Sequence, residues 1–220
     1  MNLVMLNGSP RGKKSNTQVL LNQLCIGMNS VNDIECQTYY LRETKNTQEH
    51  IDIVKAADLI VLGFPLYTDG MPGVVKHFID NLVPADLAGK PMAFLVQSGF
   101  PEAKHSRPVA RYLEKLCKRI NTTYCGTIIR GNSEGIRLRP ENANRKIFEQ
   151  FNGLGASLAY DGKFKQDLLE KVAGPEELTW AMKQVFKTPM SNFYWNMMLK
   201  KNEAFEKRFD APYGPAFIDK

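Results

Sequence analysis

Long hydrophobic runs are missing from this 220-residue sequence, and no stretch has the apolar length that crossing a bilayer requires. Near the N-terminus, the short run Leu3–Leu6 is broken by Asn7, Gly8 and Ser9, too early for a secretory signal peptide. A cytoplasmic protein is therefore expected. Hydrophobic residues make up 43% of the chain and charged residues 24%, which allows one sizeable globular core with an appendage.

Cysteine is also scarce. The four cysteines, Cys25, Cys36, Cys117 and Cys125, form no CxxC pair and no group with the spacing of metal ligands. We therefore expect no metal site, no iron–sulfur cluster and no dense disulfide framework. Each cysteine falls within an apolar helical or strand-like pattern, which favours buried thiols.

A concentrated run of one charge is missing as well. The chain has 29 basic and 23 acidic residues, a net charge of +6 and a pI near 9.1, which favours anionic ligands. From Tyr160 to the end there are 10 basic and 9 acidic residues, so the surplus lies in the first part of the chain. Because no basic stripe and no nucleic-acid-binding module is recognisable, no nucleic-acid partner is expected.

The first 160 residues alternate short apolar runs with amphipathic helical patterns, which is typical of a parallel sheet covered by helices on both faces. The clearest strand, Asp58–Phe64, suits a central position buried on both sides. Strict alternation predicts a doubly wound α/β fold with five strands in the order 2-1-3-4-5. The expected strands are Leu3–Leu6, Ile34–Tyr40, Asp58–Phe64, Pro91–Gln97 and Thr123–Ile129, and the helices begin near Thr17, Asn46, Gly73, Pro108 and Pro140.

Residues 160–220 differ in character, so we predict a domain at 1–159 and a helical C-terminal extension at 160–220. Helices are expected at Lys163–Val172 and at Glu176–Phe186, the second opened by Pro175. Beyond Pro189 the pattern loosens into aromatic and methionine-rich sequence. Membrane contact is possible for this stretch, but packing on its own domain or across a dimer is favoured. The residues concerned are Phe193, Trp195, Met197 and Met198, beside Lys200 and Lys201.

In doubly wound sheets, ligands bind beyond the carboxyl ends of the strands, where the strand order reverses. Here that point lies between the first and third strands. The loop from Asn7 to Thr17 leads from a strand into a helix, so free N–H groups, hydroxyls and an amide would cradle a phosphate. Arg11 would add a charge-assisted contact. The expected phosphate contacts are Ser9, Arg11, Ser15, Asn16 and Thr17.

Two other phosphate-binding motifs are excluded. A nucleoside-triphosphatase loop needs four residues between its glycines and then Lys followed by Ser or Thr. Here three residues separate Gly8 from Gly12, and Lys13 is followed by Lys14. The dinucleotide fingerprint GxGxxG is absent too.

The loop after the third strand, from Pro65 to Gly73, suits a planar ring system, because it combines apolar walls, backbone N–H groups and little side-chain motion. Leu66 and Tyr67 would cover one face of such a ring. Backbone amides near Tyr67 and Thr68 would bond its polar edge.

These two loops resemble those of the NAD(P)H-dependent FMN reductase family, over roughly Met1 to Ser157. The motifs that carry the resemblance are Gly8-Ser-Pro-Arg…Ser15-Asn-Thr17 and Pro65-Leu-Tyr…Met71-Pro72…Lys76…Phe78-Ile-Asp80. The resemblance implies a flavodoxin-like fold that binds FMN, with the phosphate in the first loop and the isoalloxazine on the third. It also implies NAD(P)H as co-substrate and a homodimer. The cysteine cluster of the family's iron–sulfur branch is missing here.

The resemblance further places a glycine-containing turn after the fourth strand against the flavin. That turn implies Ser98 and Gly99 as contacts, with Phe100 shaping the substrate side. His105 nearby is interpreted as an exposed loop residue rather than a proton donor. The flavin-ring contacts expected on both loops are thus Pro65, Leu66, Tyr67, Thr68, Ser98 and Gly99.

The expected function is that of an FMN-dependent NAD(P)H oxidoreductase. Hydride would pass from nicotinamide to FMN and then to a small-molecule acceptor: a flavin, a quinone or another small oxidant. Because the cofactor carries the chemistry, no catalytic side chain is named. The alternatives are an FMN-binding electron carrier, which a pI near 9.1 disfavours, and a flavin-dependent sensor or interaction protein. Arg130, Asn132, Ser133 and Glu134 would contact nicotinamide phosphate, a partner subunit or solvent alone.

Overall fold

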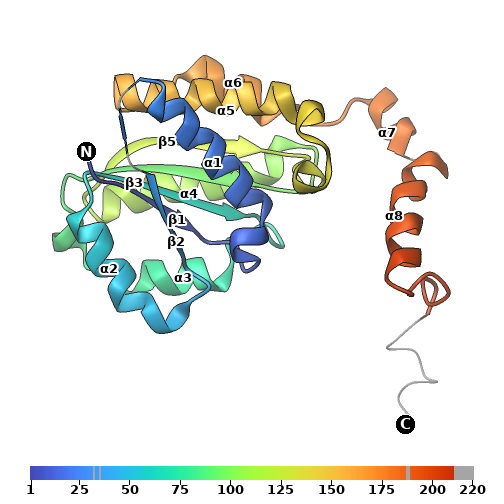
Figure 1. The fold of residues 1–220 in the computed structure, drawn as a ribbon, viewed down its shortest axis with the longest axis horizontal. Coiled ribbons are helices and arrows are strands. Elements are labelled where there is room, and N and C mark those ends of the chain that lie inside the picture. Colours follow the sequence, from blue (N-terminus) through green and yellow to red (C-terminus); the bar gives the residue numbers. More distant parts are fainter. Residues whose placement is uncertain (32, 35, 187–188, 211–220) are drawn as a thin grey trace, which may run out of the picture. The chain divides into compact units, whose positions relative to one another are not determined.

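The computed structural model describes residues 1–31, 33–34, 36–186 and 189–210. Five parallel strands form one sheet in the order β2-β1-β3-β4-β5, which confirms the predicted doubly wound, flavodoxin-like fold (Figure 1). In the centre of the sheet, Leu3 of β1 pairs with Cys36 of β2 and with Leu59 of β3. The strands are β1 Leu3–Asn7, β2 Cys36–Tyr40, β3 Leu59–Pro65, β4 Pro91–Gln97 and β5 Thr123–Arg130; Glu35, within the predicted second strand, lies outside the described residues.

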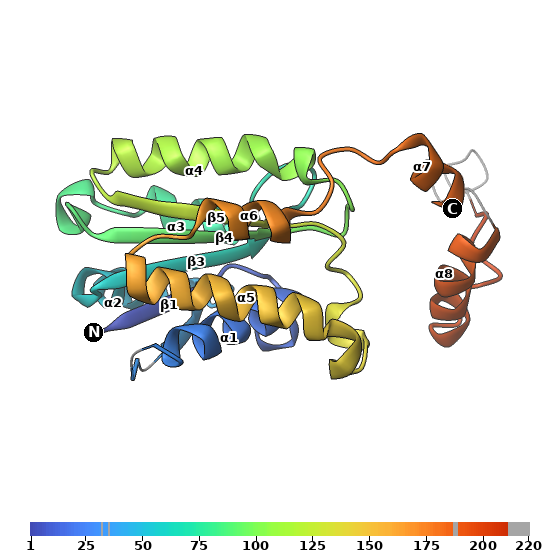
Figure 2. The ribbon, with the colours of Figure 1, turned by 90° about the horizontal axis from the view of Figure 1, so that it is seen from above.

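Helices cover both faces of this sheet. Figure 1 shows α1 and α5 on one side of the strands and α2 and α3 on the other, and in Figure 2 α4 lies opposite α5. Each side has its own apolar core, one around Leu21 and Phe151 and the other around Phe78 and Leu113. All seven residues of β3 are buried, as expected for a central strand. The helices are α1 Asn16–Asn29, α2 Thr47–Ala56, α3 Gly73–Asp80, α4 Arg107–Arg119, α5 Glu141–Asp161 and α6 Gln166–Ala173.

Helices α1 and α5 approach each other at two glycines. A Cβ atom on Gly27 would lie 1.9 Å from the carbonyl oxygen of Asn152, and one on Gly155 would lie 2.0 Å from that of Leu24. Both obstacles are backbone atoms, which cannot swing aside as a side chain can. This contact holds α1 in place, and α1 begins at the loop that follows β1.

The chain after α5 departs from the predicted helix boundaries. Helix α6 begins at Gln166 rather than Lys163 and packs on β5 and α5. When residues are grouped by their contacts, Met1–Glu177 form one compact unit and Leu178–Lys220 a second. The boundary after residue 159, which rests on the change in composition, stays a prediction. The sequence pattern could not show that α6 packs on the sheet.

The predicted helix Glu176–Phe186 is wrong at its start, because α7 spans Trp180–Phe186. The N–H groups of Ala103 and Lys104 donate to the carbonyls of Pro175 and Glu176, which holds this segment in a non-helical conformation. Beyond Pro189, where the sequence pattern loosens, the chain forms a further helix, α8, spanning Pro189–Lys201, as the predicted helical extension requires. In the part of the chain that the structure describes, no helix combines the length and apolar character that crossing a membrane needs.

The expectation of four buried thiols is wrong for two of them. Cys25 of α1 and Cys36 of β2 form a disulfide, and both are partly exposed. Cys117 and Cys125 are free and buried. Burial raises the pKa of the Cys117 thiol, and it raises the pKa of Cys125 to about 11. Apolar neighbours in the sequence are compatible with a disulfide-bonded cysteine as well as with a free thiol. The sequence pattern therefore could not distinguish the disulfide pair from the free cysteines.

Alkylation by iodoacetamide at about pH 8 should therefore label no cysteine in the native, unreduced protein. Burial blocks access to Cys117 and Cys125, and their raised pKa values keep the reactive thiolate scarce. After unfolding we expect two labels without a reductant and four with one, counted by intact-mass spectrometry. Four labels without a reductant, or a label on Cys125 in the folded protein, would contradict these assignments.

Candidate functional site

The loop between β1 and α1 is organised from within by a buried asparagine, Asn7. Its Oδ1 accepts the N–H of Ser9 at 2.9 Å, and its Nδ2 donates to Gln18 Oε1 at 2.9 Å and to Ser15 Oγ at 3.2 Å. Asn7 is fully buried and was not among the predicted site residues. The available signal was a polar residue ending an otherwise apolar strand. Its hydrogen bonds fix the path of the loop around it.

Ser15 caps helix α1. Its Oγ accepts the N–H of Gln18 at 3.1 Å and donates to the Gly12 carbonyl at 2.7 Å, so its proton is used inside the loop. The N–H groups of Asn16 and Thr17 come first in the helix, where no intrahelical acceptor exists. Among the described residues, no other group accepts from them. Two free donors at the positive end of a helix make a favourable position for an anion.

A small cavity, of about 40 Å³, lies between this loop and the loops after β3 and β4. All the predicted site residues except Thr17 and Thr68 line it. Thr17 is buried, and Thr68 is exposed. Gln97 and Glu134 line the cavity in addition to the predicted contacts. The predicted residues that line it are Ser9, Arg11, Ser15, Asn16, Pro65, Leu66, Tyr67, Ser98 and Gly99.

Gln97, the last residue of β4, connects the loops beneath the cavity. Its Nε2 donates to Thr17 Oγ1 at 3.3 Å, and its Oε1 accepts from the Ser133 hydroxyl. Ser133 also hydrogen-bonds to the carbonyl of Ser98 at 2.7 Å. Like Asn7, Gln97 is a polar residue ending an apolar strand. These hydrogen bonds connect the start of α1 with the loops after β4 and β5. All the side chains involved are buried.

The loop after β3 forms a tight turn. Tyr67 and Gly70 exchange two backbone hydrogen bonds, at 2.9 and 3.0 Å. The two central residues, Thr68 and Asp69, have φ values of 49° and 58°, as a type I′ turn requires. Leu66 is buried, and its N–H donates to the Gln97 carbonyl at 2.8 Å. The turn therefore presents a firmly held Tyr67, whose surface is 45% exposed at the rim of the cavity.

His105 is less exposed than expected. Its Nε2 lies 3.3 Å from Glu102 Oε2, its Nδ1 lies 3.5 Å from Asp69 Oδ1, and its ring lies 4.7 Å from that of Phe100. The imidazole therefore connects the turn after β3 to the loop after β4. His105 does not line the cavity.

The loop after β5 brings a carboxylate to the cavity. Glu134 Oε1 lies 3.3 Å from Arg11 Nη1, an ion pair between residues far apart in the sequence. The carbonyl of Glu134 accepts from Asn16 Nδ2 at 3.2 Å, and Asn16 Oδ1 accepts the N–H of Arg137 at 3.1 Å. Asn16 thus joins the two loops with its side chain. The sequence also left the role of Arg130 undecided. In the structure its Nη1 donates to the Val172 carbonyl at 3.1 Å.

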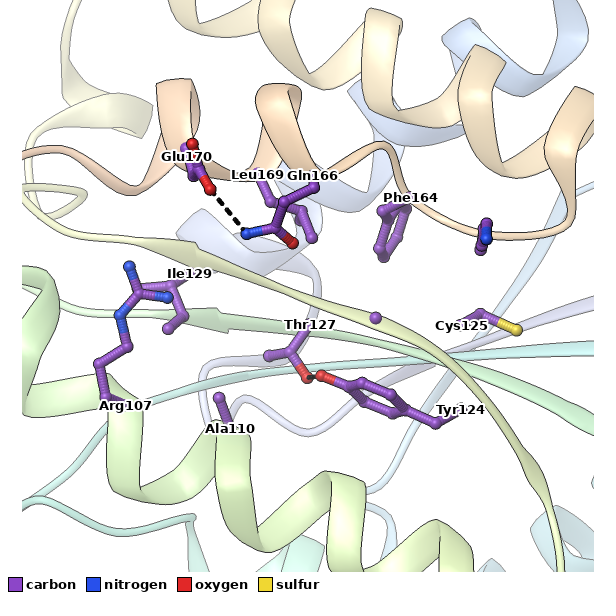
Figure 3. Close-up of a pocket in the computed structure, with 12 residues that line it drawn as sticks. Arg107, Ala110, Tyr124, Cys125, Thr127, Ile129, Phe164, Gln166, Leu169 and Glu170 are labelled. Carbon is purple, nitrogen blue, oxygen red and sulfur yellow. Dashed lines mark hydrogen bonds between the residues drawn. The ribbon is translucent and has the colours of Figure 1, made fainter.

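A larger cavity, of about 280 Å³, lies beside the outer edge of β5, between α4 and α6 (Figure 3). Polar side chains along it pair with one another. Gln166 Nε2 donates to Glu170 Oε1 at 2.8 Å, and the Tyr124 hydroxyl donates to Thr127 Oγ1 at 2.8 Å. These pairs use polar atoms of four lining side chains. We place the site at the smaller cavity because it adjoins the free N–H groups at the start of α1.

The smaller cavity brings anion donors and a half-exposed aromatic side chain close together. The donors are the N–H groups of Asn16 and Thr17 and the guanidinium of Arg11; the aromatic surface is that of Tyr67. Within the described residues, no three His, Cys, Asp or Glu side chains gather in a way that could hold a metal ion. The arrangement suits a ligand with a phosphate at one end and a flat ring at the other.

Comparison with known proteins points to flavoenzymes. A family model described as NADPH-dependent FMN reductase matches residues 1–124. An NADPH azoreductase of Bacillus sp. (strain OY1-2) is 30% identical over 107 residues, which cover 45% of this chain and 60% of that protein. The chain therefore spans less than two thirds of the length of this curated relative.

Two solved structures share the fold at low sequence identity. An NAD(P)H:quinone oxidoreductase from Methanothermobacter marburgensis has a TM-score of 0.57 at 13% identity, covering 73% of this chain and 98% of that one. An FMN-dependent NADH-azoreductase from Bacillus anthracis str. Ames Ancestor, in complex with FMN, has a TM-score of 0.54 at 13% identity, covering 72% and 100%. At this identity the likeness establishes the fold alone.

Proposed function

Because the chain belongs to the NADPH-dependent FMN reductase family, we propose that it oxidises NADPH or NADH and passes the electrons through FMN to a small-molecule acceptor. The acceptor classes we propose are a flavin, a quinone or an azo compound, the last because the curated relative is an NADPH azoreductase. The observation that carries this proposal is the pair of free N–H groups at the start of α1, beside Arg11 and close to the exposed Tyr67.

The donor set fits the phosphate of FMN. Two helix N–H groups and a guanidinium supply charge-assisted hydrogen bonds to a phosphate monoester. We propose that Ser9, Arg11 and the N–H groups of Asn16 and Thr17 contact it. Ser15 and the side chains of Asn16 and Thr17 would act by fixing the loop, since their polar atoms already bond within the protein.

The enclosed volume limits what the cavity itself can hold. About 40 Å³ is small beside the roughly 300–1,000 Å³ of ordinary ligand pockets. That volume suits the phosphate group of FMN, so its ring system would lie against side chains at the rim of the cavity. We propose that these are Pro65, Leu66, Tyr67, Thr68, Ser98 and Gly99.

When bound, FMN would supply the chemistry of accepting and returning a hydride. The residues of this chain would bind, orient and shield it. The tight turn from Tyr67 to Gly70 would hold the Tyr67 side chain in place against the ring. The buried hydrogen bond between Ser133 and Gln97 would hold the loops after β4 and β5 at a constant separation. No protein nucleophile is required.

Steady-state kinetics test this proposal. We expect oxidation of NADPH or NADH that depends on added FMN and on an acceptor such as a quinone or an azo dye. Double-reciprocal plots at several acceptor concentrations should be parallel, because nicotinamide and acceptor take turns at one site. Nicotinamide oxidation no faster than without the protein would refute the proposal. Bound FMN that neither nicotinamide reduces would instead indicate a carrier or a sensor.

We also propose a homodimer and a cytoplasmic location. The support for a dimer is that Phe193, Trp195 and Phe209 in the second unit are 71%, 58% and 84% exposed, apolar side chains that a second copy of the chain would cover. Light scattering coupled to size-exclusion chromatography would show a dimer or a monomer.

A further inference from the structure

The cavity holds a negative charge where an anion would bind. Of the described residues that line it, Glu134 carries the carboxylate and Arg11 the cation, and the two are paired at 3.3 Å. Their side chains are 45% and 48% exposed, so neither charge is sealed from water.

Glu134 is held in this position by its neighbours. Its carbonyl accepts from Asn16 Nδ2 at 3.2 Å, and the preceding residue, Ser133, is fully buried and bonds to Gln97 and to the Ser98 carbonyl. The backbone around Glu134 is thus fixed to the phosphate loop on one side and to the loop after β4 on the other. Because Glu134 also lines the cavity, its carboxylate lies close enough to act on an anion bound there.

We propose that Glu134 weakens the binding of the flavin phosphate and thereby sets how readily FMN leaves the site. This inference rests on the proposed function. A phosphate monoester carries a charge of about −1.5 to −2 at pH 7. Such a group competes with Glu134 for the charge of Arg11, and it is repelled by the nearby carboxylate.

The proposed effect depends on the phosphate and not on the ring. Riboflavin carries the same ring as FMN without the phosphate, so Glu134 should leave riboflavin binding unchanged. Weakened phosphate binding suits an enzyme whose flavin exchanges with the solution between catalytic cycles.

The test compares Glu134→Gln with the unmodified protein in titrations of FMN and of riboflavin, followed by flavin fluorescence. Glutamine keeps the shape of the side chain and removes its charge. The matched control is Glu149→Gln, which makes the same change in an exposed Arg–Glu pair on α5, where Arg145 Nε lies 3.7 Å from Glu149 Oε1. Glu149 does not line the cavity.

We expect Glu134→Gln to bind FMN about threefold to tenfold more tightly, as one exposed charge facing an anion would give. FMN should dissociate more slowly by a similar factor, and the gain should shrink at high salt. Riboflavin affinity should stay within about twofold, and Glu149→Gln should match the unmodified protein.

Three results would overturn the inference while leaving the proposed function intact. The first is that Glu134→Gln binds FMN no more tightly than the unmodified protein. The second is that it binds both flavins more tightly, which would indicate a change in the ring site. The third is that Glu149→Gln binds FMN more tightly by the same factor. An unmodified protein that binds neither flavin would overturn the proposed function, and the role of Glu134 with it.

Discussion

Replacing Arg11 with glutamine is expected to weaken FMN binding by about 10-fold to 100-fold, the effect of losing a hydrogen bond between charged groups. Among the described residues that line the cavity, Arg11 supplies the positive charge, beside the N–H groups of Asn16 and Thr17. Riboflavin binding should change by less than about threefold, because it brings no phosphate to the loop. Titration of both flavins, followed by fluorescence, measures the two affinities.

Lys14→Gln is the matched control for this variant. It removes the same charge from the same loop, but Lys14 is exposed and does not line the cavity. We expect its FMN affinity to fall by less than about threefold, because only a long-range attraction to the phosphate is lost. Equal losses in the two variants would mean that net charge, and not a contact from Arg11, draws the flavin to this loop.

Replacing Gly155 with alanine should destabilise the fold by about 3 kcal/mol, the upper range for forcing a methyl group into a packed interior. The added Cβ would lie 2.0 Å from the Leu24 carbonyl oxygen and 2.9 Å from the Met28 nitrogen, so α1 and α5 would have to separate. For a protein of this size, that corresponds to a melting temperature lower by roughly 6–12 °C. Thermal unfolding followed by circular dichroism measures the change.

Gly153, on the same helix, offers the control. A Cβ there would meet its nearest described neighbour, the Leu168 side chain, at 3.8 Å, which is ordinary contact. Alanine also favours a helix over glycine by about 1 kcal/mol, so Gly153→Ala should be neutral or slightly stabilising. If Gly155→Ala melts within about 2 °C of Gly153→Ala, the helices are not in backbone contact there.

The fold could be predicted from the sequence because each strand and helix of the first 160 residues has a recognisable pattern of apolar residues within its own segment. The apolar run Asp58–Phe64 shows a buried strand without any knowledge of its neighbours, and β3 is found at Leu59–Pro65. The strand order then followed from general rules of connection. The glycines at the α1–α5 contact carried no such signal, since their role depends on a helix more than a hundred residues away.

The departures lie where tertiary contacts override local pattern. Pro175 and the two glutamates after it look like the start of a helix, yet hydrogen bonds from Ala103 and Lys104 hold this segment in another conformation. In the same way, the ion pair between Arg11 and Glu134 joins two loops that only the closed sheet brings together.

The sequence predicted which loops form the candidate site better than it predicted which side chains face the cavity. The rule that ligands bind where the strand order reverses pointed to the loops after β1 and β3, and these loops do meet at one cavity. Which side chains face that cavity depends on hydrogen bonds that the sequence does not reveal. The Thr17 hydroxyl bonds to Gln97, and Ser15 uses its proton on the Gly12 carbonyl.

The most direct test of FMN-dependent reduction at this site is the visible absorption spectrum of the protein with FMN, recorded without oxygen before and after addition of NADPH or NADH. We predict a flavin spectrum shifted by binding, bleached by at least one nicotinamide and restored by a quinone or an azo dye. A bound flavin that neither nicotinamide bleaches would contradict a reductase and leave a carrier or a sensor. A spectrum identical to that of free FMN would contradict the binding site itself.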